Sequence, residues 1–192
     1  MKKLILILFI VVISTLCFSR TAIELYEAGI NEINRDNPYS AIHLFNKALR
    51  INPYYRQCYE GLAKVYIKLH NYFEAYKNLE IALKFDKNNI NNLLDMAHVR
   101  MQLAQQPGAI LNAEDYLLKA FNREPRNKRV LSLYGDYFER RGFQDRALDY
   151  YKKALLVDER DSEILIRIAK TYFKKKDYSR AEKYLQLTEE IN

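Results

Sequence analysis

The chain is poor in the residues that interrupt regular structure: its 192 residues include five glycines, four prolines and no tryptophan. So few glycines and prolines leave little room for long flexible or low-complexity stretches. Cysteine is scarce as well, and Cys58 is the only one beyond residue 20. One thiol forms neither an internal disulfide nor a metal cluster, so we interpret Cys58 as a small buried apolar residue.

Apolar residues are plentiful at 49%, and sixteen tyrosines and nine phenylalanines supply large side chains for a continuous core. Tyrosine packs its ring while its hydroxyl stays wet, which suits half-buried helix faces. The formal charge is +7, of which Lys2 and Lys3 contribute two. No basic helix or aromatic RNA-reading motif accompanies this mild excess, so we do not expect a nucleic-acid partner.

The N-terminal segment has the layout of a secretory signal peptide. A short basic start is followed by an apolar run over residues 4–13, and then by the small residues Cys17 and Ser19. This order predicts a signal peptide over residues 1–19, and hence an exported protein that is periplasmic or anchored facing the outside.

Two alternatives to cleavage stay open. Residues 4–18 could remain as a membrane anchor, although a spanning helix needs about 20 apolar residues. Cys17 could carry lipid, although bulky Leu16 stands where bacterial lipoproteins have a small residue. In each case we expect membrane contact only through this segment. It has no polar face, which argues against a first core helix.

Small residues recur with a period of about 34 along the rest of the chain. One alanine series is spaced 34, 38, 34 and 34 residues apart: Ala41, Ala75, Ala113, Ala147 and Ala181. A second small series follows seven residues later: Ala48, Ala82, Ala120, Ala154 and Thr188. Large residues lie between them: Phe45, Leu79, Leu117, Tyr151 and Leu185. Further small residues precede the first series: Gly29, Ala63, Ala97, Gly135 and Ala169. Ala97 lies sixteen residues ahead rather than twelve, which locates a four-residue insertion.

This spacing predicts pairs of closely packed helices. Small residues let two helices approach, and large residues three or four positions away fill the adjoining grooves. Short turns separate the predicted helices at Asp36-Asn37-Pro38, His70-Asn71-Tyr72, Arg141-Gly142-Phe143 and Lys176-Asp177-Tyr178. Helices should also end at Asn52-Pro53 and Glu124-Pro125, because the residue before proline avoids the helical region.

The pattern resembles the tetratricopeptide repeat family, whose unit is a helix–turn–helix of 34 residues. The fourth repeat carries the family pattern as Leu131, Tyr134, Gly135, Phe138, Ala147, Tyr151 and Ala154, with Glu159 in place of proline. The resemblance covers 22–192, in repeats 22–55, 56–89, 90–127, 128–161 and 162–192. It implies an all-α fold, a right-handed α-solenoid of five stacked repeats after the hydrophobic N-terminal segment.

Some positions depart from the family pattern. Glu32 and Arg100 stand where a large residue is usual, and the insertion at 105–108 is either a neutral loop or a contact loop. One position of the second helix is apolar in four repeats but becomes Glu189 in the fifth. A polar face is typical of a terminal repeat, which predicts that the stack ends there.

The sequence has no pattern typical of an enzyme. His43, His70 and His98 lack the i, i+4 spacing of a helical zinc site, and neither a phosphate loop nor a nucleophile elbow is present. We therefore predict no catalytic activity, cofactor or metal.

The resemblance implies a partner-binding groove lined by the first helix of each repeat. The residues expected to contact a partner are Tyr26, Ile30, Glu60, Lys64, Leu94, His98, Met101, Arg129, Asp136, Ile166 and Lys170. Ile33 belongs to the same groove, which runs from apolar at the first repeat to charged at the last three. An extended or helical peptide with an apolar anchor and charged flanks would match it.

These observations predict a non-catalytic scaffold or adaptor of the cell envelope that binds an unidentified protein or peptide. Two alternatives remain: a self-associating structural component of an envelope complex, and a membrane-tethered lipoprotein involved in assembly.

Overall fold

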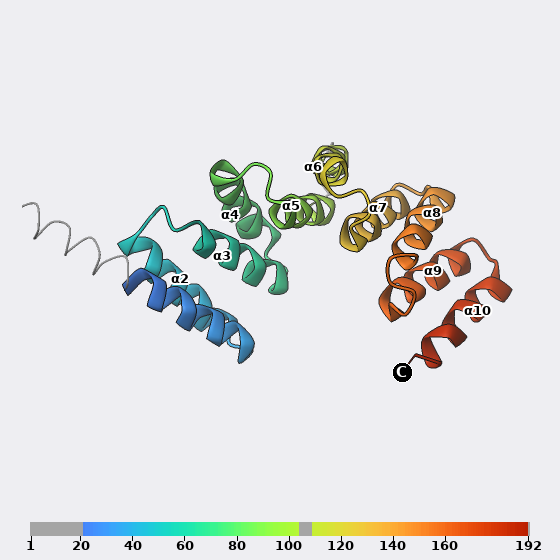
Figure 1. The fold of residues 1–192 in the computed structure, drawn as a ribbon, viewed down its shortest axis with the longest axis horizontal. Coiled ribbons are helices and arrows are strands. Elements are labelled where there is room, and N and C mark those ends of the chain that lie inside the picture. The colour runs from blue at the N-terminus through green and yellow to red at the C-terminus, as the bar shows by residue number, and fades with distance from the viewer. Residues whose placement is uncertain (1–20, 104–108, 192) are drawn as a thin grey trace, which may run out of the picture. The chain divides into compact units, whose positions relative to one another are not determined.

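The computed structural model describes residues 21–103 and 109–191, in which every regular element is a helix. Figure 1 traces them in order. A helix over residues 21–34 precedes α2 (Pro38–Ile51), α3 (Arg56–Lys68), α4 (Tyr72–Phe85), α5 (Ile90–Gln102), α6 (Ala109–Arg123), α7 (Lys128–Arg140), α8 (Gln144–Leu155), α9 (Ser162–Lys174) and α10 (Tyr178–Glu189). The predicted all-α helical-repeat fold is confirmed.

Packing is most extensive between the two helices of a predicted repeat: α3 with α4, α5 with α6, α7 with α8 and α9 with α10. The chain divides into two compact units, Met1–Lys87 and Asn88–Asn192. We call them the N-terminal and C-terminal units. The division falls close to the expected boundary between the second and third repeats.

Side-chain caps fix where several helices begin. The side chains of Asn71, Asn89, Asn127, Asp161 and Asp177 each accept a hydrogen bond from a backbone N–H of the first turn that follows. Such caps satisfy donors that a helix start otherwise leaves open. The repeat therefore encodes its helix starts in local polar residues as well as in its core.

The turns inside four repeats share one backbone feature. Asp36, His70, Gly142 and Lys176 occupy the same repeat position, and each has a positive φ between 56° and 80°. The N–H of each bonds to a carbonyl of the preceding helix, as does the N–H of the residue that follows. This is the left-handed ending that commonly closes an α-helix, and glycine adopts it with least strain.

The core confirms the small–large–small pattern in four repeats. Phe45, Leu79, Leu117 and Tyr151 are all 0% exposed. In the fifth repeat Leu185 is 47% exposed, so the expectation that it fills a groove there was wrong. Within the described residues no further helix covers α10 on that side, and the side chain is left at the surface.

Cys58 is a free, fully buried cysteine, as its sequence context predicted. Burial raises the pKa of its thiol to about 12, so the reactive thiolate scarcely forms at neutral pH.

The predicted signal or anchor segment at 1–19 and the insertion at 105–108 lie outside the described residues. None of the helices in the described part combines the length and apolarity needed to cross a membrane.

Candidate partner-binding face

In the N-terminal unit, the face that was predicted to bind a partner is built around the tightly packed ring of Phe45. A Cβ added at Gly29 would lie 2.5 Å from Cε1 of Phe45, and one at Gly61 would lie 2.8 Å from its Cζ. The ring therefore lies against backbone from the helix over 21–34 and from α3. Ile30 and Ile33 pack against the same cluster, which gives this face an apolar base.

Beside this base the N-terminal unit has a hollow of about 250 Å³. Its walls come from the end of the helix over 21–34, the start of α2 and the last turns of α3. The lining residues are Ile33, Pro38, Lys64, Val65 and Lys68. Two residues of the predicted groove, Ile33 and Lys64, thus meet at one concave place.

The two lysines of the hollow differ in their engagement. Lys68 forms an ion pair with Asp36 across the repeat boundary. Lys64 is exposed and has no ion-pair partner among the described residues. A free ammonium at the rim of an apolar hollow is able to bind an anion from outside.

The other predicted contacts of the N-terminal unit are partly engaged within it. The ring of half-buried Tyr26 lies 5.7 Å from that of Phe45 and 5.3 Å from that of Tyr55. Glu60 pairs with Arg56 at 3.3 Å. Both side chains belong to the helices that carry the hollow's walls, but neither lines it.

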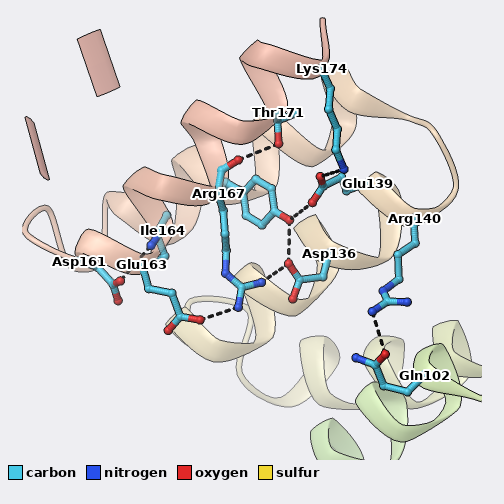
Figure 2. Close-up of polar contacts among 11 residues, drawn as sticks. Gln102, Asp136, Glu139, Arg140, Asp161, Glu163, Ile164, Arg167, Thr171 and Lys174 are labelled. Atoms are coloured by element: carbon cyan, nitrogen blue, oxygen red, sulfur yellow. Dashed lines mark hydrogen bonds and ion pairs between the residues drawn. The ribbon is translucent and has the colours of Figure 1, made fainter. Parts of the chain in front are cut away.

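In the C-terminal unit, ion pairs connect the first helices of successive repeats. Arg129 of α7 pairs with Asp95 of α5. Arg167 of α9 pairs with Asp136 of α7, and Lys174 reaches Glu139 at 2.5 Å. We call these three cross-helix pairs the ion-pair ladder. Figure 2 shows its α7–α9 part, in which the cationic side chains of α9 reach across to the carboxylates of α7.

A buried tyrosine ties the ladder to the core. The Tyr151 hydroxyl lies 2.7 Å from Asp136 and 3.0 Å from Glu139, so both carboxylates converge on it. Burial raises the pKa of Tyr151, and the two carboxylates raise it further because a phenolate beside them would be repelled. The hydroxyl therefore stays a donor at neutral pH.

His98 lies among charges of both signs in the C-terminal unit. Burial lowers the pKa of His98, and Arg140 lowers it further, against the opposing effect of Asp136 and Asp95. Arg140 itself donates to the Met101 carbonyl at 3.2 Å and to Gln102 at 3.0 Å. At neutral pH the imidazole is uncharged and adds no charge to this face.

The structure separates the predicted contact residues into groups. Leu94 and Met101 are each 1% exposed and present no surface to a ligand. Arg129 and Asp136 are engaged in the ladder. Ile166 is half-buried and Lys170 is exposed.

Sequence reasoning missed the walls that Pro38, Val65 and Lys68 give the hollow, and it missed the ladder. A signal for the ladder was present in the sequence. Its acid–base pairs are separated by 34, 31 and 35 residues, close to one repeat period. Opposite charges at that offset lie on neighbouring first helices.

No group of three or more metal-ligating side chains gathers anywhere in the described residues. In the N-terminal unit, an apolar hollow with an unpaired lysine at its rim suits recognition of a ligand. In the C-terminal unit, taken by itself, the charges of the first helices are paired with one another.

Comparisons with known proteins agree with this architecture. The tetratricopeptide repeat family model matches residues 162–192. Among curated proteins, the chain is 27% identical over 124 residues to the RNA polymerase-associated protein CTR9 of Saccharomyces cerevisiae. That match covers 65% of this chain but only 11% of the much longer yeast protein.

Among solved structures, the chain is similar to TTC0263, a tetratricopeptide repeat protein of Thermus thermophilus, with a TM-score of 0.76 and 20% identity. That likeness covers 88% of this chain and 90% of the other. Pseudomonas aeruginosa pilF gives 0.75 and 20%, covering 91% and 78% of the two chains. YrrB, described as having an unusual peptide-binding site, gives 0.64 and 21%, covering 89% and 86%. At these identities the likeness concerns the fold. With the repeat pattern and the family match in its last repeat, it identifies the chain as a protein of the tetratricopeptide-repeat fold.

Proposed function

We propose that this protein is a non-catalytic scaffold that holds a partner protein by a peptide segment on the inner face of its N-terminal unit. The observation that carries the proposal is the hollow where Ile33 and Lys64 meet, since it joins an apolar wall to an unpaired charge. Tetratricopeptide repeats are protein-binding modules, and one structural relative is described by its peptide-binding site.

The C-terminal unit would serve as the rigid part of the scaffold. Its first helices are linked to one another by the ladder, whose three carboxylates already have cationic partners. A ligand would have to displace those pairs before it gained contacts of its own. Binding is therefore favoured on the N-terminal unit, where Lys64 lies unpaired beside an apolar hollow.

The proposal places the scaffold in the cell envelope. Its support is the basic, apolar and small-residue order of residues 1–19, which is typical of an export signal. Cell fractionation, together with the intact mass of the mature protein, tests this. Loss of the segment supports cleavage, an added lipid mass at Cys17 supports the lipoprotein alternative, and recovery in the cytoplasm refutes export.

Site-specific photocrosslinking in cells tests the binding role. One variant of the full chain carries a photoreactive residue in place of Lys64, and a matched control carries it in place of Lys84, an exposed lysine of α4. We expect a discrete crosslinked species from position 64 that is absent from position 84.

The composition of the crosslinked species decides between the functions. A different protein supports the scaffold role, whereas a species of twice the chain's own mass supports the self-association alternative. Equal, diffuse labelling from both positions would refute a partner-binding role for this face.

A further inference from the structure

We infer that the hollow of the N-terminal unit receives a peptide segment in which one large apolar side chain is adjacent to an acidic residue. This inference rests on the proposed function and names the chemistry of the partner. Three features of the hollow lead to it: its size, its apolar walls and the charge at its rim.

The size and the walls specify the anchor. Ile33, Pro38 and Val65 line the hollow, whose volume of about 250 Å³ suits a single large side chain rather than a drug-sized ligand. Burying such a side chain removes its apolar surface from water, which favours a large anchor over a small one. Val65 is only 3% exposed, so the hollow has a fixed wall on the α3 side.

The rim specifies the charge beside the anchor. Lys64 lines the hollow and lacks an ion-pair partner within the described residues, whereas Glu60, one turn earlier on α3, is held by Arg56. A carboxylate beside the anchor would pair with Lys64, and a basic residue there would be repelled. Lys68 adds to this positive rim, although Asp36 offsets part of its charge.

The ladder gives no comparable selection in the C-terminal unit. Its acidic and basic groups neutralise one another in pairs, so neither sign of ligand charge is favoured. The preference for an acidic flank should therefore come from the rim of the hollow, where Lys64 contributes most because Asp36 offsets part of the charge of Lys68.

An array of synthetic decapeptides tests the inference with the purified full-length chain in mild detergent. All peptides share a Ser/Gly frame, the central residue is Leu, Phe or Ala, and the next residue is Glu, Ser or Lys. We expect Leu and Phe peptides followed by Glu to bind at least tenfold better than their Lys counterparts. The Ala peptides should lose binding whatever follows them.

A charge-reversal variant supplies the decisive comparison. Lys64→Glu should reverse the preference from Glu-flanked to Lys-flanked peptides, whereas Lys84→Glu, which makes the same charge change on α4, should leave it unaltered. Resistance of Cys58 to alkylation in each variant confirms that the unit stays folded.

Two outcomes overturn the inference: no anchor-dependent binding in the array, or an unchanged flank preference in Lys64→Glu. The proposed function fails separately, by the crosslinking result. A partner that crosslinks at position 64 and lacks the apolar–acidic pair would refute only the inference.

Discussion

The first and fourth repeats build the same packing device with opposite chemistry. In the first repeat, the ring of Phe45 lies against Gly29, and Ile30 and Ile33 pack against the cluster that contains this ring, so the edge is apolar at both positions. A hollow opens beside this edge.

In the fourth repeat the same positions are polar. Tyr151 lies against Gly135, and its hydroxyl reaches Asp136 and Glu139, which occupy the places of the two isoleucines. Cations from α9 then close over the carboxylates.

The two repeats differ at all three positions of this edge together, which are apolar in the first repeat and polar in the fourth. The packing of the aromatic ring against a glycine is the same in both. A single buried hydroxyl or carboxylate would have lacked a partner and destabilised the fold. The apolar version leaves a surface that a ligand can cover, whereas the polar version satisfies itself. This is why two repeats with equally buried aromatic rings are expected to have different roles.

The largest effect should come from filling the shared glycine position. A Cβ at Gly135 would lie 2.2 Å from Cε1 of Tyr151, whose hydroxyl is held by two carboxylates, so the ring cannot retreat easily. We expect Gly135→Ala to lower the free energy of unfolding by about 2 kcal/mol in urea denaturation, despite alanine's better helix propensity.

The control for this prediction is a compensating pair. The second repeat has Ala63 and Leu79 at the same two positions, with Leu79 fully buried. In a Tyr151→Leu background, Gly135→Ala should therefore cost much less than in the parent chain. If the cost is equal in both backgrounds, steric contact with the ring is not its cause.

The next largest effect concerns the hydroxyl itself. Tyr151→Phe removes the donor that Asp136 and Glu139 share, and we expect a loss of about 1–2 kcal/mol in the free energy of unfolding. The reciprocal change, Phe45→Tyr, brings a hydroxyl toward Ile30 and Ile33 and should give no gain. A stabilised Phe45→Tyr variant would contradict the idea that polarity here works only as a set.

The ladder should contribute less per pair. Arg167→Met removes the cation beside Asp136 and also its 2.6 Å contact with Glu163, which we expect to lower unfolding free energy by about 1 kcal/mol. The pair of Arg180 with Asp177 is the control, since the Arg180 side chain is 64% exposed and its loss in Arg180→Met should have a smaller effect in water.

Salt sharpens the same test. High salt should weaken the parent chain's ladder and so reduce the difference between parent and Arg167→Met. An unchanged difference at 1 M salt, about ten times ordinary ionic strength, would show that packing of the arginine stem matters more than its charge.

The sequence predicted the buried layer well because that layer repeats. Phe45 and Tyr151 were identified from spacing alone, and both are fully buried. It predicted the face less well, because exposure depends on what lies next to a residue in space. Leu94 and Met101 share the register of groove residues yet are buried.

The charged groove residues illustrate the same limit. Asp136 was expected to be available to a ligand, but it already forms an ion pair with Arg167 of the next repeat. Position within one repeat does not show whether the adjacent repeat already supplies the opposite charge. The hollow was also beyond prediction in detail, because Pro38 and Val65 join it from a helix start and a core position.

A smaller effect should appear on acidification. The pKa of His98 is lowered by burial and by Arg140. Between this lowered pKa and the ordinary histidine value of about 6.5, the unfolded chain therefore binds more protons than the folded chain. The neutral imidazole's contribution is complete above that value and is lost as the pH falls through the lowered pKa. We expect His98→Gln to lose less stability than the parent chain between pH 7 and about 5.5, measured by urea denaturation.

The opposite slope would contradict this sign. If the parent became more stable on acidification relative to His98→Gln, the neighbouring carboxylates Asp95 and Asp136 would outweigh burial and Arg140. The two variants are compared at the same salt concentration, so that screening of the surrounding charges does not enter the difference.

The smallest expected effect is that of Lys176→Gly, which tests the turn separately from the apolar or polar edge. Lys176 has a φ of 62° at the position where the fourth repeat has Gly142, at 80°. Glycine removes the strain of a left-handed side-chain residue but raises the entropy of the unfolded chain, so the two effects partly cancel. We expect Lys176→Gly to stabilise the protein only slightly, seen as a small rise in Tm.

Gly142→Ala should destabilise the protein by about 1 kcal/mol, although a Cβ there meets no atom within 4 Å. Equal responses to the two changes would mean that backbone strain is not what distinguishes these turns. Opposite responses would show that the turn acts independently of the polar or apolar edge beside it, because the fourth and fifth repeats both contribute to the ladder but have different residues at this turn position.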